Sequence, residues 1–176
     1  MEPLGTIEEA EEKVLSDVHR CLSRIKQLAV QPFETAGSGV SILRRIRSET
    51  YEDLNQIQHE YFVLRAAQWL LTNRVCEQGT MWWWNPRQTG TSREPDLQGR
   101  RHNGDVVLAA EITTSESSEG KIDTRMRITL TKLSEMEGAR YYFVCTDSMR
   151  QRANTKVARA GWPITVVMIP DGGQLI

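Results

Sequence analysis

A run of five apolar residues, Val106 to Ala110, ends at the acid Glu111, and this combination restricts the fold more than any other feature of the chain. The run follows Asn103-Gly104, a pair that favours a two-residue hairpin turn, so we expect residues 106–113 to form a strand that returns from an earlier one. A strand that is apolar on both faces lies inside a sheet. A carboxylate in such a place costs several kcal/mol unless it is paired, protonated or bound to a cation. Glu111 therefore needs a partner.

Asp96 is the residue that the hairpin brings to Glu111. With a turn centred on Asn103-Gly104, Asp96 opens the outgoing arm and stands at the mirror position of Glu111. Opposite side chains of an antiparallel pair lie within about 5.5 Å, so two carboxylates there repel each other unless a cation or a proton lies between them. Mg²⁺ is typically held by one or two carboxylates together with water and phosphate oxygens. The two acids therefore predict a site for a divalent cation.

The rest of the chain alternates between helical and strand patterns. Apolar spacing predicts helices over Thr6–Val30, Ser48–Glu77, Lys121–Glu137 and Ser148–Ala160, with Thr6 as the cap of the first. Short apolar runs predict strands over Met81–Trp84, Asp96–Arg100, Val106–Thr113, Tyr141–Cys145 and Pro163–Ile169. Residues 31–40 contain one proline and two glycines and are predicted to be a connection. The order α, α, β, β, β, α, β, α, β indicates an α/β fold.

Size and composition favour one α/β domain with a helical appendage. The chain has 176 residues, and we expect residues 1–47 to form a helical N-terminal segment with its connection and residues 48–176 to form the core. No apolar run approaches the roughly 20 residues of a membrane helix, and the acidic start lacks a secretory signal. The three cysteines are odd in number and far apart, which favours reduced thiols. We therefore expect a soluble cytoplasmic protein without a membrane partner.

The acids and the order of elements together resemble a known superfamily. Pro95-Asp96 on one strand and Glu111-Ile112-Thr113 on the next, within an αβββαβ order over roughly residues 48–170, resemble the PD-(D/E)XK nucleases, which have a restriction-endonuclease-like fold. The resemblance implies a mixed central sheet flanked by helices, with the helical N-terminal segment as an extension. It also implies hydrolysis of DNA phosphodiester bonds with Mg²⁺, or with Mn²⁺, in restriction, defence or repair.

The same resemblance assigns roles to individual residues. Asp96, Glu111 and the backbone carbonyl of Ile112 would be metal ligands. Thr113 stands where the family has a lysine that orients the attacking water, and a neutral hydroxyl supplies no positive charge there. Lys121, at the start of the next helix, would reach back as a substitute, with Lys132 and Arg125 as weaker candidates. Glu60, on the helix before the sheet, would assist in catalysis and in metal binding.

Arginine is the predominant cation of the chain, with 17 arginines against 5 lysines. Its planar guanidinium suits phosphate oxygens, so this composition permits phosphate partners, and the resemblance implies DNA as the partner. The predicted contacts to the DNA backbone are Arg100, Arg101, Arg125, Arg152, Lys156 and Arg159. A homodimer or a partner subunit is also expected, with the first helix as the contact.

Each prediction has a simpler alternative. Asp96 can be a turn or strand-edge acid, Glu111 can pair with Arg125 or Arg127, and the arginines can form an ordinary solvated surface. Glu60 can be a salt-bridged acid at the margin of the core, and Lys121 a solvated helix-start lysine. The corresponding alternative function is that of a nuclease-fold protein that has lost its lysine and serves as a DNA-binding or assembly subunit, and cleavage of RNA is a third.

Overall fold

The computed structural model describes residues 1–86, 93–117 and 119–170, and a six-stranded mixed sheet lies at its centre. The strands occupy the sheet in chain order, and each pairs with the next. From β1 to β4 each strand is antiparallel to its neighbour, whereas β5 and β6 run parallel to β4. Their bounds are Glu2–Pro3 (β1), Met81–Trp84 (β2), Leu97–Arg100 (β3), Val106–Thr113 (β4), Ala139–Val144 (β5) and Ile164–Met168 (β6). The predicted α/β class is therefore confirmed.

At its end next to the acids, the β3–β4 hairpin has the register that the sequence predicts, but its turn differs: Arg101 pairs with Asp105, so the loop has three residues instead of the expected two. Leu97 pairs with Ala110, and this alignment continues to Gly99, beyond which a bulge shifts the pairing by one residue. The loop turns at Gly104, whose φ of +92° is a conformation that glycine adopts without strain. A short loop with a glycine at this point fixes which residues of the two strands stand opposite each other.

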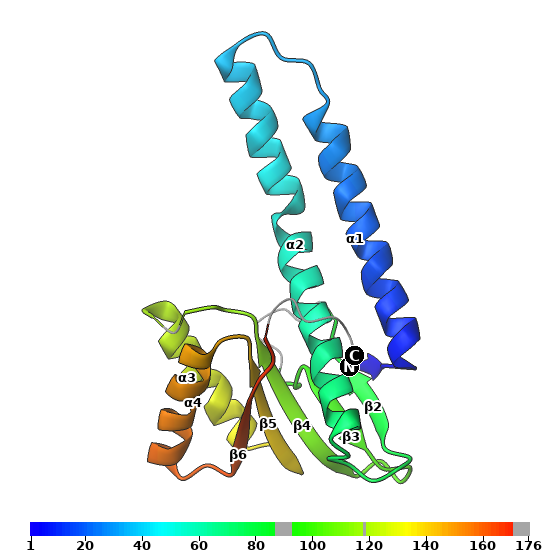
Figure 1. Cartoon of the computed structure of the whole chain (residues 1–176), viewed down its shortest axis with the longest axis vertical. Coiled ribbons are helices and arrows are strands. Elements are labelled where there is room, and N and C mark those ends of the chain that lie inside the picture. Colours follow the sequence, from blue (N-terminus) through cyan, green and yellow to red (C-terminus); the bar gives the residue numbers. More distant parts are fainter. Residues whose placement is uncertain (87–92, 118, 171–176) are drawn as a thin grey trace.

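Four helices cover the sheet, with bounds Ile7–Ala29 (α1), Ala36–Thr72 (α2), Lys121–Ser134 (α3) and Asp147–Ala160 (α4). α3 and α4 lie on one face, while the C-terminal part of α2 and the start of α1 lie on the other (Figure 1). Thr6 caps α1 as predicted, in a reciprocal capping box with Glu9. Within the described ranges, no helix has the length and apolarity needed to cross a bilayer.

α2 is longer than the sequence pattern suggests. It begins at Ala36 instead of Ser48 and runs for 37 residues, so the predicted division between residues 47 and 48 falls inside a continuous helix. The predicted helix start at Ser48 was wrong because the glycines in residues 36–39 resemble a connection, whereas Thr35 and Ser38 cap each other's backbone and start the helix there. Packing along α1 then offsets the poor helix propensity of this first turn.

Two hydrophobic clusters lie on opposite faces of the sheet, and β4 contributes to both. Leu108, Ala110 and Ile112 pack under α1 and α2, whereas Ala109 packs under α3 and α4. Side chains of a strand alternate between faces, so Glu111 projects toward the α3 face together with Ala109. The fold therefore presents this acid to α3.

Gly138 is expected to be a sensitive position of the fold. It joins α3 to β5 with a φ of +78°, and a Cβ there would lie 2.4 Å from the carbonyl carbon of Val107. Gly104 also has a positive φ but has no atom within 4 Å of such a Cβ. We expect Gly104→Ala to lower the free energy of unfolding by about 1–2 kcal/mol, from backbone strain alone. Gly138→Ala should cost on the order of 2 kcal/mol more because β4 must shift.

Urea denaturation of the two glycine variants measures this difference. Equal losses of unfolding free energy in Gly138→Ala and Gly104→Ala would contradict the close approach of the α3–β5 connection to β4.

Candidate functional site

Two buried acids stand opposite each other at one end of the β3–β4 hairpin. Asp96 directly precedes β3, and since Leu97 pairs with Ala110, the next positions outward are Asp96 and Glu111. Asp96 is 2% exposed and Glu111 is 5% exposed. The register predicted from the Asn-Gly turn thus brings the two candidate metal ligands to facing positions. Two carboxylates that are both buried from solvent require compensating positive charge or protonation.

Glu111 has its cationic partner on α3. The Nζ of Lys132 forms an ion pair with Glu111 Oε1 at 2.5 Å and donates a hydrogen bond of 3.1 Å to the backbone carbonyl of Glu94. Burial, and then the negative charge of Asp96, raise the pKa of Glu111 to about 8, although Lys132 acts in the opposite direction. The carboxyl group of Glu111 therefore changes its charge close to neutral pH.

Asp96 is held by the backbone of β4 and by α2. Its Oδ2 accepts a hydrogen bond of 2.7 Å from the backbone N–H of Ile112, and the Nε2 of His59 lies 3.4 Å from the same oxygen. Burial lowers the pKa of His59, but Asp96, with smaller contributions from Glu60 and the Ile112 backbone, raises it above the usual value. The other oxygen of Asp96, Oδ1, is buried and has no hydrogen-bond partner among the described residues.

Glu60 belongs to a second buried charge cluster beside the first. It is 1% exposed, and its Oε2 accepts a hydrogen bond of 2.6 Å from the Nζ of Lys13, which also bonds Asp17 at 3.1 Å. The same ammonium lies 5.4 Å from the centre of the Trp84 ring. Because Lys13 is on α1 and Glu60 on α2, this ion pair joins the base of the two helices. The structure thus pairs Glu60 with Lys13 rather than with the two facing acids.

Thr113 and Lys121 occupy different surroundings from those expected of a catalytic pair. Thr113 follows Glu111 on the same face of β4, and its hydroxyl lies 2.7 Å from the hydroxyl of Tyr142, whose pKa burial raises to about 12. Both hydroxyls are therefore neutral at ordinary pH. Lys121 is the exposed first residue of α3, whereas Lys132, near the other end of that helix, contacts Glu111.

Two of the predicted DNA contacts on α4 bind an acid of α3. Arg152 Nε and Lys156 Nζ lie 2.7 Å and 2.9 Å from the same oxygen of Asp123. Hydrogen bonds from Arg152 and then Lys156 lower the pKa of Asp123 to about 2. Arg159, in the last turn of the same helix, is exposed. A phosphate that binds this helix would therefore compete with Asp123 for two of the three cations.

The predicted contacts on the hairpin are engaged by neighbouring side chains. The guanidinium of Arg100 lies 4.6 Å from the centre of the Trp83 ring, and Arg101 is 3.3 Å from a carboxylate oxygen of Glu77. Both contacts are on the β2 side of the hairpin. Arg100 and Arg101 are thus separated from the cations of α4 by the width of the sheet.

A shallow groove opens between the end of β4 and α3. Its volume is about 220 Å³, and it is lined by residues 112–115 and by Ile122, Arg125, Met126 and Thr129. Arg125 is thereby the predicted DNA contact that lines the groove at the end of β4. Since residues 112 and 113 directly follow Glu111, the groove adjoins the acid pair.

The residues present can hold a small divalent cation with only two carboxylates. Within residues 1–86, 93–117 and 119–170, no three His, Cys, Asp or Glu side chains form a group of metal ligands. The buried, unbonded Oδ1 of Asp96 and the facing Glu111 nevertheless fit the ordinary mode of Mg²⁺, which needs one or two carboxylates with water and phosphate oxygens. Glu60, bound to Lys13, is not part of that donor set.

The contact of His59 with Asp96 was not predicted, and Lys132 was rated below Lys121. His59 shares no metal-type spacing with the other histidines, so only its position next to Glu60 could have suggested it. Lys132 could have been preferred because Leu130 and Leu133 beside it face the core. A lysine beside buried positions at the end of a helix can extend along the sheet toward a buried acid.

The raised pKa of Glu111 predicts a specific dependence of stability on pH. Between about pH 4.5 and pH 8 the folded state keeps a proton on Glu111 that the unfolded state has lost, so the free energy of unfolding should fall as the pH rises through this range. The expected fall is on the order of a few kcal/mol. Glu111→Gln should make the slope shallower, as measured by urea denaturation at several pH values. A slope identical to that of the wild type would contradict this assignment.

Comparison with known proteins gives no relative on which to base a function. No family model, no curated protein and no solved structure matches the chain. The function therefore has to be inferred from the acid pair, its cations and the groove beside it.

Proposed function

We propose that this protein is a metal-dependent DNA endonuclease of the PD-(D/E)XK type, with a restriction-endonuclease-like core. The observation that carries the proposal is the facing pair of buried acids, Asp96 and Glu111, one of which has an oxygen without a hydrogen-bond partner among the described residues. Buried anions with unused oxygens are costly and are often found where a cation binds. The order of α2, β2, β3, β4, α3 and β5 agrees with the αβββαβ pattern of that superfamily.

Asp96 and Glu111 would hold the cation, Mg²⁺ or Mn²⁺. A divalent cation in this position lowers the pKa of a bound water and neutralises charge on a phosphate. The backbone N–H of Ile112 and the side chain of His59 fix the orientation of Asp96, which limits the positions that its free oxygen can take. A loose carboxylate would be a poorer ligand, so these contacts favour a preformed donor pair.

Lys132 is the residue that we assign to the role of the absent motif lysine. It already lies beside Glu111, and its ammonium supplies the positive charge that the neutral hydroxyl of Thr113 lacks. An ammonium in this position would orient a water molecule or stabilise negative charge that develops on the phosphate. Arg125, in the adjoining groove, is placed to contact a phosphate of the bound strand.

A second candidate function is that of a nuclease-fold subunit that binds DNA without cutting it. It is favoured by one observation: each acid already has a basic side chain of the chain itself beside it, Lys132 for Glu111 and His59 for Asp96. An acid pair neutralised in this way is stable without a metal ion. The two candidates differ in whether a divalent cation replaces these partners.

Plasmid cleavage with Mg²⁺ or Mn²⁺ tests the enzymatic proposal. We expect wild type to nick DNA and both Asp96→Asn and Glu111→Gln to lose at least about 100-fold in rate, because each removes a metal ligand. Lys132→Met should lose about 100-fold as well, whereas the matched control Lys121→Met, on the same helix but exposed, should keep its activity. Equal rates for wild type and the acid variants would reject the site.

Thermal unfolding with added Mg²⁺ tests metal binding without a cleavage assay. A cation that binds only the folded state raises the melting temperature. We expect millimolar Mg²⁺ to stabilise wild type more at pH 8 than at pH 6, since Glu111 must lose its proton to bind, and to leave Asp96→Asn unchanged. DNA binding with neither cleavage nor Mg²⁺ stabilisation would favour the second candidate. Cleavage of RNA in place of DNA would correct the substrate.

A further inference from the structure

The arm formed by α1 and the N-terminal part of α2 extends away from the sheet as an antiparallel pair of helices (Figure 1). Several large apolar side chains of this arm are exposed, although ordinary surface helices keep such residues for their buried stripe. They are Leu15, Leu22, Val40, Leu43, Tyr51 and Leu54, and we refer to these six residues as the apolar face of the arm. Leu43 is 66% exposed.

The apolar residues of α1 lie beside its inward stripe. Val14 and Cys21 are buried, and Leu15 and Leu22 each follow one of them by a single residue. One residue along an α-helix is a turn of about 100°, so both leucines point sideways from the contact with α2.

The apolar residues of α2 have the same relation to its inward stripe. Leu43 follows the half-buried Ile42, and Tyr51 follows the buried Thr50. Because the two helices are antiparallel and face each other, a turn of the same sense on each helix leads to the same side of the arm. The exposed apolar residues of both helices therefore lie on the same side of the arm.

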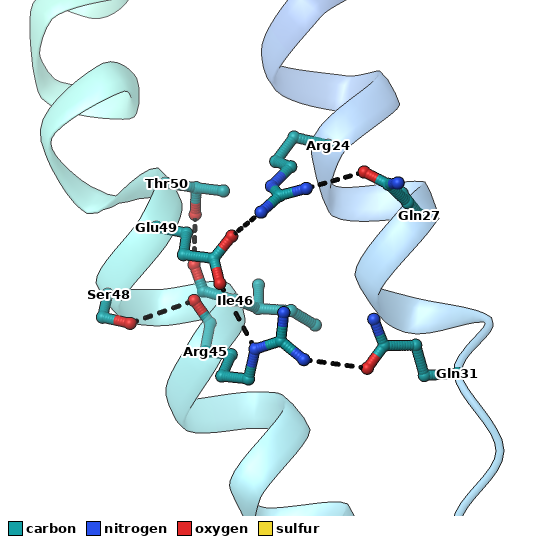
Figure 2. Close-up of polar contacts among 8 residues, drawn as sticks. All are labelled: Arg24, Gln27, Gln31, Arg45, Ile46, Ser48, Glu49 and Thr50. Carbon is teal, nitrogen blue, oxygen red and sulfur yellow. Dashed lines mark hydrogen bonds and ion pairs between the residues drawn. The ribbon is translucent and has the colours of Figure 1, made fainter.

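The opposite side of the arm is polar and already has its partners. Arg24 of α1 binds Glu49 of α2, Arg45 lies 3.3 Å from the same carboxylate, and Arg45 donates a hydrogen bond of 3.1 Å to Gln31 (Figure 2). Arg24 precedes the inward Ile25, and Glu49 precedes the inward Thr50, so these residues turn to the side away from the apolar face. The arm thus has one polar side with cross-helix ion pairs and one apolar side without a covering element among the described residues.

We propose that a second copy of this chain covers the apolar face, with the two α2 helices antiparallel. The sequence of α2 is self-complementary about Arg47: Val40 and Leu54 lie seven residues to either side of it, and Leu43 and Tyr51 lie four residues to either side. A twofold axis at Arg47 therefore places Val40 against Leu54 of the second copy and Leu43 against its Tyr51. Such self-complementarity is what an isologous interface requires and what an unrelated partner would not need.

Arg47 is compatible with this axis. Its long aliphatic stem can lie over the apolar contacts while the guanidinium stays in water, and a tyrosine ring near it is a favourable neighbour. Two arginines at the axis repel each other, so they restrain the affinity rather than prevent the contact.

The size of the face fits a reversible dimer. From Val40 to Leu54 the helix is about 21 Å long, and two adjacent helices are about 20 Å wide. Two such faces would together bury about 840 Å², which is below the standard size of a stable interface and in the range of weak, transient complexes. We therefore expect association in the micromolar range rather than an obligate dimer.

Sedimentation of the full chain over a range of concentrations tests this proposal and needs no nuclease activity. We expect wild type to dimerise and Leu43→Glu to raise the dissociation constant at least about tenfold, since it places a charge in an apolar contact. Leu54→Glu should act in the same way. The matched control is Ile128→Glu on α3, where the wild-type side chain is 60% exposed, and it should still dimerise. Wild type that stays monomeric at hundreds of micromolar, or a dimer unaffected by Leu43→Glu, would overturn the proposal.

Crosslinking tests the arrangement of the two copies. A twofold axis at Arg47 predicts that Arg47→Cys is joined to itself by a short thiol-specific linker. Gln27→Cys, on the polar side of the arm, should show no more crosslinking than wild type. Crosslinking through residue 27 and none through residue 47 would overturn the proposed interface.

Discussion

The burial of two carboxylates at one end of a strand pair is the interaction on which the rest of the molecule depends. Asp96 and Glu111 repel each other in a place with little water, and such a pair is tolerated only with compensating charge. The compensation comes from both sides of the sheet, since Lys132 belongs to α3 and His59 belongs to α2. The acid pair therefore links the two helical layers through the sheet between them, and it requires both layers to be in place.

This arrangement also explains why the two candidate functions are close to each other chemically. The ammonium of Lys132 and a divalent cation are alternative ways to neutralise Glu111. If the flexible side chain of Lys132 changes its conformation, its ammonium remains close to the acids. It can then take the proposed role of the lysine that orients the attacking water. If it stays, the same ion pair has a structural role only. The two candidate functions thus differ in the position of one side chain.

Local sequence signals predicted the features that depend on neighbouring residues. The turn signal at Asn103-Gly104 and the apolar run after it predicted that Asp96 lies opposite Glu111. The loop is one residue longer than this signal implies, and the pairing is kept because the bulge between Gly99 and Arg100 offsets the extra residue. The start of α2 was not predicted because it depends on the reciprocal capping contacts of Thr35 and Ser38. These contacts offset the low helix propensity of the glycines in the first turn.

Contacts between distant residues could not be predicted in the same way. His59 reaches Asp96 only because the C-terminal part of α2 packs on the sheet, and the choice of Lys132 over Lys121 depends on how α3 lies against β4. Periodicity gives the face of a helix and not its placement on a sheet. The positions of the two acids could therefore be predicted from the sequence. The basic side chains beside them could be identified only from the tertiary structure.

The short strand β1 has a consequence for how copies of this protein meet. It closes one edge of the sheet with only two residues, Glu2 and Pro3, and proline has no N–H group to offer to a further strand. A charged side chain and a proline on so brief an edge discourage growth by strand addition, the route by which many sheets aggregate. Self-association through the helical arm, as proposed above, would remain finite, because a twofold contact is satisfied by one neighbour.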